Sequence, residues 1–293
     1  MEEMKNNNAN QTVAILLATY NGGRYLAEQL DSLFGQTVTA WTLYVHDDGS
    51  KDGTVQILHD YAARHDNLVI LDYPSQHGAK NNFLSLVRQV EADYYFFCDQ
   101  DDRWVEDKVE RQLRQMQRLE QTHSADKPLL VFSDTYVADA NLNVIHPSLW
   151  RLSGAHPEFL TTFDEAAATP FVTGCTMLFN RAARNSILWP ADKATMHDAW
   201  ITLCILKDQG IVFPIPSPLL YYRQHGSNTL GASDLSKHGL AYKLRHLKTV
   251  LRKDIALLRM LHALGYGSFL KFLKYKHVYK SRCRKARQTE QQP

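Results

Sequence analysis

Short apolar runs alternate with amphipathic segments along most of the chain. The apolar runs have the length of buried strands, and the segments between them carry apolar residues three or four positions apart, as on one face of a helix. The predicted strands are residues 13–19, 43–46, 68–71, 94–98, 128–133 and 219–223, and residues 171–180 are expected to return to the sheet. The predicted helices are residues 23–34, 54–64, 81–91, 105–120 and 197–209. This alternation predicts an α/β fold with a mostly parallel, Rossmann-like sheet that helices cover on both faces.

The C-terminal part has a different pattern. Its apolar positions recur every three or four residues, at Leu240, Leu244, Leu247, Leu251, Ile255, Leu258 and Leu261. Lysines and arginines occupy the other faces, and residues 269–276 then mix aromatic residues with lysines. The pattern predicts a basic amphipathic helix or a pair of such helices. Two interpretations are open: the segment lies in a membrane interface, or it packs on the rest of the protein with a solvated basic face.

Size and composition set the number of domains. With 293 residues, of which 44% are hydrophobic and 22% charged, the chain can form one large domain and an appendage. We expect a disordered lead-in at residues 1–11, a main α/β domain at 12–230 and a basic helical tail at 231–293. The junction falls near the Gly-, Ser- and Asn-rich stretch 226–236.

The overall net charge of +2 conceals a split between two parts of the chain. Residues 237–293 hold 15 Lys or Arg and 2 Asp or Glu, a net charge of +13, whereas residues 1–236 carry −11. This asymmetry predicts a tail that meets an anionic surface. No nucleic-acid recognition motif accompanies the basic residues, so we do not expect a nucleic-acid partner.

The apolar runs and the cysteines indicate the compartment. No run approaches the roughly 18 apolar residues that cross a bilayer, and the polar N-terminal residues lack a signal-peptide core. The cysteines are Cys98, Cys175, Cys204 and Cys283. They are far apart and form no metal-binding pair, so we interpret most of them as buried thiols in a reducing cytoplasm.

An acidic turn follows the predicted strand 94–98. Asp99-Gln100-Asp101-Asp102 places three carboxylates where a parallel strand ends, and ligands of open α/β sheets bind outside these ends. Clustered carboxylates repel one another unless a cation or protons offset their charge. A hard divalent cation held together with substrate phosphates fits this need. The alternative is an acidic loop that caps a helix starting near Val105.

Two other predicted strands also end in polar turns. Residues 13–19 run into Tyr20-Asn21-Gly22-Gly23, and residues 43–46 run into Asp47-Asp48-Gly49-Ser50-Lys51-Asp52-Gly53-Thr54. Each turn by itself is explained by a tight connection between a strand and a helix. Three such turns at one edge of a sheet are typical of a nucleotide-binding fold. No Gly-x-Gly-x-x-Gly motif follows any predicted strand, and this argues against a dehydrogenase.

These three motifs, in this order and spacing, resemble those of the family 2 glycosyltransferases. The resemblance runs from about residue 13 to about residue 227. Asp99-Gln100-Asp101-Asp102-Arg103-Trp104, His197-Asp198-Ala199-Trp200 and Tyr222-Arg223-Gln224-His225-Gly226-Ser227-Asn228 look most like the bacterial rhamnosyltransferase-type branch. The resemblance implies the glycosyltransferase A fold and a nucleotide-sugar donor.

The resemblance also implies which residues bind the donor. Tyr20 and Asp48 are expected to contact the nucleotide, and Lys80 to lie near its phosphates at a helix start. From the residues alone, Asp47 is as well explained by a turn cap as by a base contact. Lys80 is likewise compatible with an ordinary helix N-terminus.

A cation, Mg²⁺ or Mn²⁺, is implied at the acidic turn. Asp101 is expected to bind it directly, while Asp99 binds the donor ribose or a cation-bound water. His225, with its neighbour Arg223, is expected to close over the diphosphate or to ligate the cation. A hydrogen-bonded loop histidine is the alternative for His225, and orientation of the loop or capping of the next helix is the alternative for Asp102.

Asp198 matches the position of the family's catalytic carboxylate, which implies that it is the general base. The simpler alternative is a helix cap, because acidic residues favour the first turn of a helix. The neighbouring His197 would orient this carboxylate or the acceptor, although a histidine at a helix start is more often on the surface. Gly174 allows the close approach of a sugar or marks a bulge.

Together these features predict a metal-dependent, inverting glycosyltransferase that moves a single sugar, with rhamnose as the candidate. The acceptor is expected to be a hydroxyl of a cell-surface glycan or a lipid-linked molecule at the cytoplasmic face of a bacterial inner membrane, so we favour membrane contact by the tail. A sugar nucleotidyltransferase is one rival, but the chain lacks its Gly-rich, Arg-containing loop after the first strand. A catalytically inactive, membrane-associated sugar-binding protein is the other.

Overall fold

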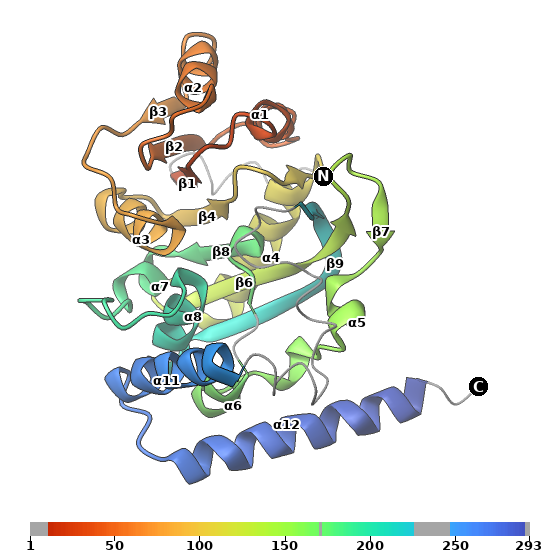
Figure 1. Ribbon diagram of the computed structural model, residues 1–293. Helices are drawn as coiled ribbons and strands as arrows, with labels where there is room; N and C mark the ends of the chain where they lie inside the picture. The colour runs from red at the N-terminus through yellow and green to blue at the C-terminus, as the bar shows by residue number, and fades with distance from the viewer. Residues whose placement is uncertain (1–10, 170–171, 226–246, 291–293) are drawn as a thin grey trace.

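The computed structural model describes residues 11–169, 172–225 and 247–290, with side chains in the last segment only for residues 252–288. Within these residues one curled sheet runs through the molecule with helices on both sides (Figure 1). Its strands are β1 (Val13–Thr19), β2 (Thr42–Asp47), β3 (Leu68–Ile70), β4 (Tyr94–Cys98), β5 (Arg103–Trp104), β6 (Leu129–Ala138), β7 (Val144–His146), β8 (Met177–Asn180) and β9 (Ile211–Arg223). The main helices are α1 (Leu26–Phe34), α2 (Thr54–Ala62), α3 (Ala79–Gln89), α4 (Lys108–His123), α5 (Leu149–Ser153), α6 (Phe163–Ala168), α7 (Arg181–Asn185), α8 (His197–Lys207), α11 (Leu247–Ala263) and α12 (Phe269–Glu290).

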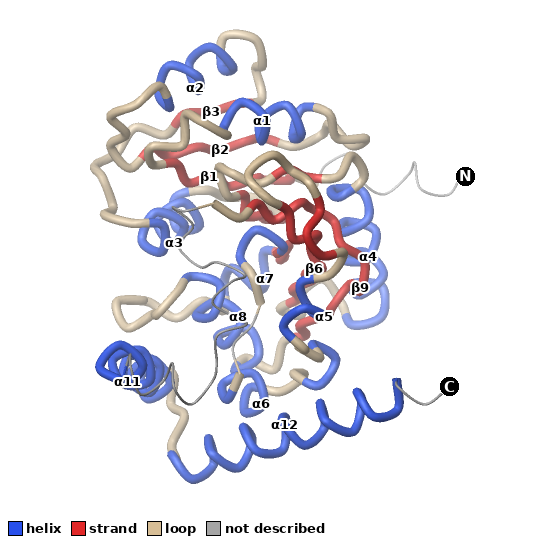
Figure 2. Tube along the Cα trace, turned by 45° about the vertical axis from the view of Figure 1, so that its right-hand side comes forward, coloured by secondary structure: helices blue, strands red, loops and turns tan. Residues whose placement is uncertain are grey.

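The order of the strands is β3-β2-β1-β4-β8-β6-β9-β5, with β7 paired to β6. β3, β2, β1 and β4 are all parallel, which confirms the predicted parallel, Rossmann-like arrangement in this half of the sheet. β8 then enters antiparallel between β4 and β6, so the segment expected to return to the sheet does so. Figure 2 shows the strands as one continuous layer through the centre.

Both faces of the sheet are covered, as the apolar runs predicted. Along β1, Ala14 and Leu16 belong to the core that contains α3 and α8, while Ile15 and Leu17 belong to the core that contains α1 and α4. Successive side chains of a strand point to opposite faces, so a strand buried on both sides must be apolar at nearly every position. This explains why the strands appear in the sequence as uninterrupted apolar runs.

The tail packs on the main domain over the part whose side chains are described. Met260, Leu261 and Leu264 are fully buried in the same core as α8. Figure 1 shows α11 and α12 together along one side of the molecule, next to α8 and α6. Two ion pairs fix α12 to α6: Lys271 to Asp164 at 2.6 Å, and Arg282 to Glu165 at 2.8 Å.

The predicted apolar stripe of the tail is therefore only partly tested. Leu261 is buried and Ile255 is 47% exposed, whereas Leu240 and Leu244 lie outside the described residues. The expected lead-in, apart from Gln11, and the junction near residue 230 also lie outside them. Among the described helices, none combines the length and the apolar character that crossing a bilayer requires.

Candidate active site

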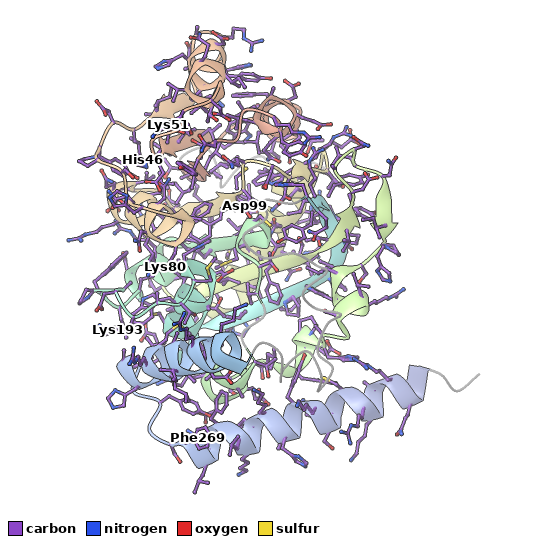
Figure 3. All side chains as sticks on the ribbon, viewed as in Figure 1. His46, Lys51, Lys80, Asp99, Lys193 and Phe269 are labelled. Carbon is purple, nitrogen blue, oxygen red and sulfur yellow. The ribbon has the colours of Figure 1, made fainter. Side chains whose placement is uncertain are left out.

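The acidic turn lies at the carboxyl end of β4, where the sequence placed it. It is followed by the short strand β5, and α4 begins only at Lys108, with Asp107 as its N-terminal flanking residue. Asp102 therefore does not cap this helix, contrary to that alternative. Figure 3 labels Asp99 near the middle of the molecule, with Lys80 below it.

Asp101 and His225 come together from distant parts of the chain. The Oδ2 atom of Asp101 lies 2.7 Å from the Nε2 atom of His225, which follows β9. Both side chains are largely buried, at 18% and 10% exposure. Two residues that were predicted to ligate a cation thus lie in one site, and the same contact also fits the alternative of a hydrogen-bonded loop histidine.

Asp99 lies within electrostatic reach of two further carboxylates. Burial raises its pKa to about 7, and the negative charges of Asp101 and Asp198 add to this effect. Asp198, although distant in sequence, thus belongs to the same site. Bringing these carboxylates together costs free energy that a divalent cation would offset.

The donor set fits Mg²⁺ or Mn²⁺ at the Asp101 side of the turn. Carboxylate oxygens suit both ions, and an imidazole nitrogen suits Mn²⁺. A deeper group of Asp99, Asp102 and Cys175 has its ligand atoms within 4.8 Å of one another. Asp102 and Cys175 are fully buried, and a thiol is a soft ligand that a hard cation does not prefer. Of the two groups, Asp101 and His225 offer the donors that better suit Mg²⁺ or Mn²⁺.

Asp198 lies in the first turn of α8 and has two main-chain donors. The N–H groups of Ala199 and Gly174 donate to its carboxylate at 2.6 and 3.2 Å. The first contact matches the helix-cap reading, and the second ties the carboxylate to the loop before β8. Burial raises the pKa of Asp198 to about 6, which suits a general base near neutral pH.

His197 is buried, so the surface reading of this histidine is wrong. Its ring stacks on Phe83 at 4.3 Å between centroids and meets the edge of Phe97 at 5.0 Å. Burial lowers its pKa to about 3, so the ring is neutral. A Cβ atom on Gly174 would lie 2.6 Å from His197 Nε2. Glycine is thus required at 174 by the histidine ring beneath it.

The loop after β1 is locked to the acidic turn by Gln100. The side chain of Gln100 accepts a hydrogen bond from the Tyr20 N–H at 2.9 Å and donates one to the Tyr20 carbonyl at 3.0 Å. Tyr20 itself is 54% exposed, as a side chain that stacks on a ligand requires. Gln100 lies inside the acidic motif, between Asp99 and Asp101, and no role was predicted for it.

The two aspartates after β2 do different things. Asp47 caps its own turn, because its carboxylate accepts from the main-chain N–H groups of Gly49 and Ser50 at 3.1 and 2.7 Å. The capping alternative therefore describes Asp47 correctly.

Asp48 holds the loop that precedes α3. Its carboxylate accepts from the Ser75 hydroxyl and from the main-chain N–H groups of Gln76, His77 and Gly78, at 2.6 to 3.0 Å. Burial would raise the pKa of Asp48, but these hydrogen bonds outweigh it and lower the pKa. Asp48 is 8% exposed, so any contact with a base is made by a carboxylate that is already engaged.

Lys80 lies in the first turn of α3, half-buried. Its Nζ atom donates to the Ala194 carbonyl at 3.2 Å, which links α3 to the loop before α8. The nearby Asn82 is fully buried and bonded to His46 through both ends of its side chain. Asn82 therefore ties α3 to β2.

Comparisons with known proteins identify the family of this chain. The model of the family described as "Glycosyl transferase family 2" matches residues 14–188. Over 276 residues the chain is 27% identical to the dTDP-rhamnosyl transferase RfbG of Shigella flexneri, which covers 87% of this chain and 86% of RfbG.

Two solved structures resemble the fold. TarS 1-349 of S. aureus, in complex with UDP, has a TM-score of 0.56 at 16% identity and covers 94% of this chain and 92% of its own. The mannosyltransferase PcManGT from Pyrobaculum calidifontis, in complex with GDP-Man and Mn²⁺, has a TM-score of 0.57 at 16% identity and covers 94% and 75%. The chain belongs to glycosyl transferase family 2, and it is a nucleotide-sugar-dependent glycosyltransferase with the glycosyltransferase A fold.

Proposed function

We propose that this enzyme transfers a single sugar, with inversion, from a nucleoside-diphosphate sugar to a hydroxyl group of a cell-surface glycan or a lipid-linked acceptor. The observation that carries the proposal is the convergence of Asp99, Asp101, Asp198 and His225 at the carboxyl end of β4. A base and a site for charge neutralisation are the two things that such a transfer needs from a protein.

Each side chain then has a defined task. Asp198 accepts the proton of the attacking hydroxyl, and its raised pKa matches this role. Asp101 and His225 would hold a divalent cation, with Asp99 beside them. That cation, when bound, supplies Lewis-acid neutralisation of the charge on the departing diphosphate.

The donor is oriented by residues around the turn. Tyr20 offers an exposed ring to the base, and Asp48 shapes the loop against which the nucleotide lies. Lys80, in the first turn of α3, is placed to meet a phosphate if it releases the Ala194 carbonyl. Asp99 would bind the donor ribose or a cation-bound water.

Inversion follows from a direct attack. Asp198 acts as a base, and no side chain acts as a nucleophile. The acceptor hydroxyl therefore displaces the diphosphate in a single step, which inverts the anomeric carbon. An oxocarbenium-like transition state of this kind is expected for glycosyl transfer.

Rhamnose is the candidate sugar, and the likeness to RfbG supports it. A thermal-shift screen of dTDP, UDP and GDP, each with Mn²⁺, tests the donor class, because a ligand that binds only the folded state raises the melting temperature. We expect dTDP to give the largest shift. NMR of the product then gives its anomeric configuration, and retention would contradict the single-displacement proposal.

We also propose that α12 brings the enzyme to the cytoplasmic face of an anionic membrane. Phe269, Leu270 and Leu273 are exposed at the start of this helix, which also carries eight Lys or Arg residues and one acidic residue, Glu290. Figure 3 shows Phe269 at the outer surface, away from Asp99. Exposed apolar side chains among cations are typical of interfacial helices.

A further inference from the structure

Arg223, the last residue of β9, is buried beneath the acidic turn. Arg223 was expected to help His225 close over the diphosphate, but only 1% of this residue is exposed. A guanidinium is costly to bury unless hydrogen bonds and an opposite charge compensate it. Its Nε atom donates to the Asp101 carbonyl and its Nη1 atom to the Ala140 carbonyl, both at 2.7 Å, and Nη2 pairs with Glu28 at 2.5 Å. The side chain is therefore engaged inside the protein, on the side of the turn away from solvent.

The contacts of Arg223 fix the main chain of the acidic turn from the protein interior. Besides the bond to the Asp101 carbonyl, the main-chain N–H of Arg223 donates to Asp102 Oδ1 at 3.1 Å. Two residues further along, His225 meets the Asp101 carboxylate. Arg223 thus holds the backbone of Asp101, while His225 meets its side chain.

Tyr25 joins both residues to the start of α1. The Arg223 Cζ atom lies 4.5 Å from the centroid of the Tyr25 ring, and the His225 ring lies 4.8 Å from the same ring. Glu28, one helical turn beyond Tyr25, binds the outer nitrogen of the guanidinium. A single buried cation therefore links α1, the acidic turn and the end of β9.

We propose that Arg223, held by Glu28, is a positioning residue that sets the geometry of the Asp101–His225 pair for a divalent cation. The inference rests on the cation role assigned to that pair in the proposed function. Residues that orient metal ligands from behind typically contribute about 10–100-fold to metal affinity. Arg223 would act through Asp101 and His225 without touching the cation or the donor.

The test measures Mn²⁺ binding to the full chain in the presence of excess UDP or dTDP, by electron paramagnetic resonance of free Mn²⁺. Arg223→Lys keeps the charge but loses the fork of donors, and Glu28→Gln removes the ion pair at a half-exposed position but keeps a hydrogen-bond acceptor for the guanidinium. We expect about tenfold weaker Mn²⁺ binding or more for Arg223→Lys, and a smaller loss for Glu28→Gln. Glu91→Gln is the matched control, because it breaks an equally short Arg–Glu pair, to Arg184 at 2.6 Å, away from this turn.

Melting temperature and metal-free nucleotide affinity separate positioning from general damage. The inference predicts that Glu28→Gln loses Mn²⁺ affinity while both of these stay near the values of the Glu91→Gln control. Unchanged Mn²⁺ affinity in folded Glu28→Gln and Arg223→Lys would overturn it, and an unfolded Arg223→Lys leaves the decision to Glu28→Gln.

Asp101→Asn shows which proposal fails. If it abolishes Mn²⁺ binding while the Glu28 and Arg223 variants do not, only the positioning role is wrong. If Asp101→Asn changes nothing, or the parent chain does not bind Mn²⁺, the proposed cation site is wrong and the positioning role falls with it.

Discussion

Asp198 is the proposed general base, which accepts the proton of the attacking hydroxyl. Asp198→Asn keeps the shape and one acceptor oxygen for the two main-chain donors, but replaces the basic carboxylate by a neutral amide. We expect kcat to fall by roughly 10²-fold or more, since general bases typically contribute this much. Donor affinity, measured by nucleotide-sugar titration, should change little. A collapse of donor binding with normal turnover of the bound donor would mean that Asp198 only caps α8.

Gly174 tests how tightly the loop before β8 is fitted. Gly174→Ala places a methyl group against the buried His197 ring, so either the loop or the ring must move. We expect a loss of about 1–3 kcal/mol in the free energy of unfolding, typical of overpacking, together with a lower kcat because Gly174 also binds Asp198. Urea unfolding and steady-state kinetics measure the two effects. Wild-type values for both would show that the contact with His197 is unimportant.

Single residues were predictable where a motif fixed their chemistry. Asp99 and Asp101 were predicted because clustered carboxylates after a buried strand need a cation or protons, whereas Asp198 was predicted only from the resemblance to family 2 glycosyltransferases. The burial of His197 and Arg223 was not predictable, because polar side chains are usually exposed and their partners, Phe83 and Glu28, are distant in sequence. The different hydrogen-bond partners of Asp47 and Asp48 were not predictable either. Asp48 binds the loop at residues 75–78, and no pattern in the sequence places that loop beside it.

At the scale of elements, the turn after β4 is destabilised by its own charge. The pKa of Asp99 is raised to about 7 from an ordinary value near 4, so the folded state binds this proton more tightly than the unfolded state. Its contribution to stability is full below about pH 4 and is lost as the pH rises to about 7. We expect Asp99→Asn to flatten this part of the stability curve of the metal-free protein.

The measurement is urea unfolding from pH 4 to 8, with and without Mn²⁺. Mn²⁺ should stabilise the protein more at pH 7.5 than at pH 5, because it competes with protons for the same carboxylates. Identical pH dependence in the parent and in Asp99→Asn would show that Asp99 does not carry the raised pKa.

Most elements were predicted from apolar periodicity, and the exceptions have a physical reason. β9 runs over Ile211–Arg223, but only residues 219–223 were predicted. Pro214, Pro216 and Pro218 interrupt its pattern, since proline cannot donate to a sheet, and the pairing with β6 shifts register nearby. β6 likewise extends beyond the predicted residue 133, through buried polar residues at 133–135.

At the scale of the whole molecule, the charge split and the exposed start of α12 predict membrane binding. Met260 and Leu264 of the tail pack into the core beside α8, so removal of the tail would expose that core. Substitutions are therefore a cleaner test than truncation. We expect the parent chain to co-sediment with anionic vesicles, less so at higher salt, because screening weakens the attraction of its cations. The double variant Leu270→Glu and Leu273→Glu should lose most of this binding.

Ile145→Glu is the control, since Ile145 is 62% exposed on β7, away from α12 (Figure 1). It should bind vesicles as the parent does. Equal binding by the parent and the double variant would rule out insertion of the start of α12 and would leave α12 as a helix that only packs on α6.

Asp101 would hold a divalent cation that offsets the charge of the departing diphosphate. The most direct measurement is the release of nucleoside diphosphate from a panel of nucleotide sugars that includes dTDP-rhamnose, by the parent chain and by Asp101→Ala, with Mn²⁺ or with excess chelator. We expect release by the parent with Mn²⁺, and loss of release in chelator or in folded Asp101→Ala. Undiminished release in chelator, or by Asp101→Ala, would contradict this expectation.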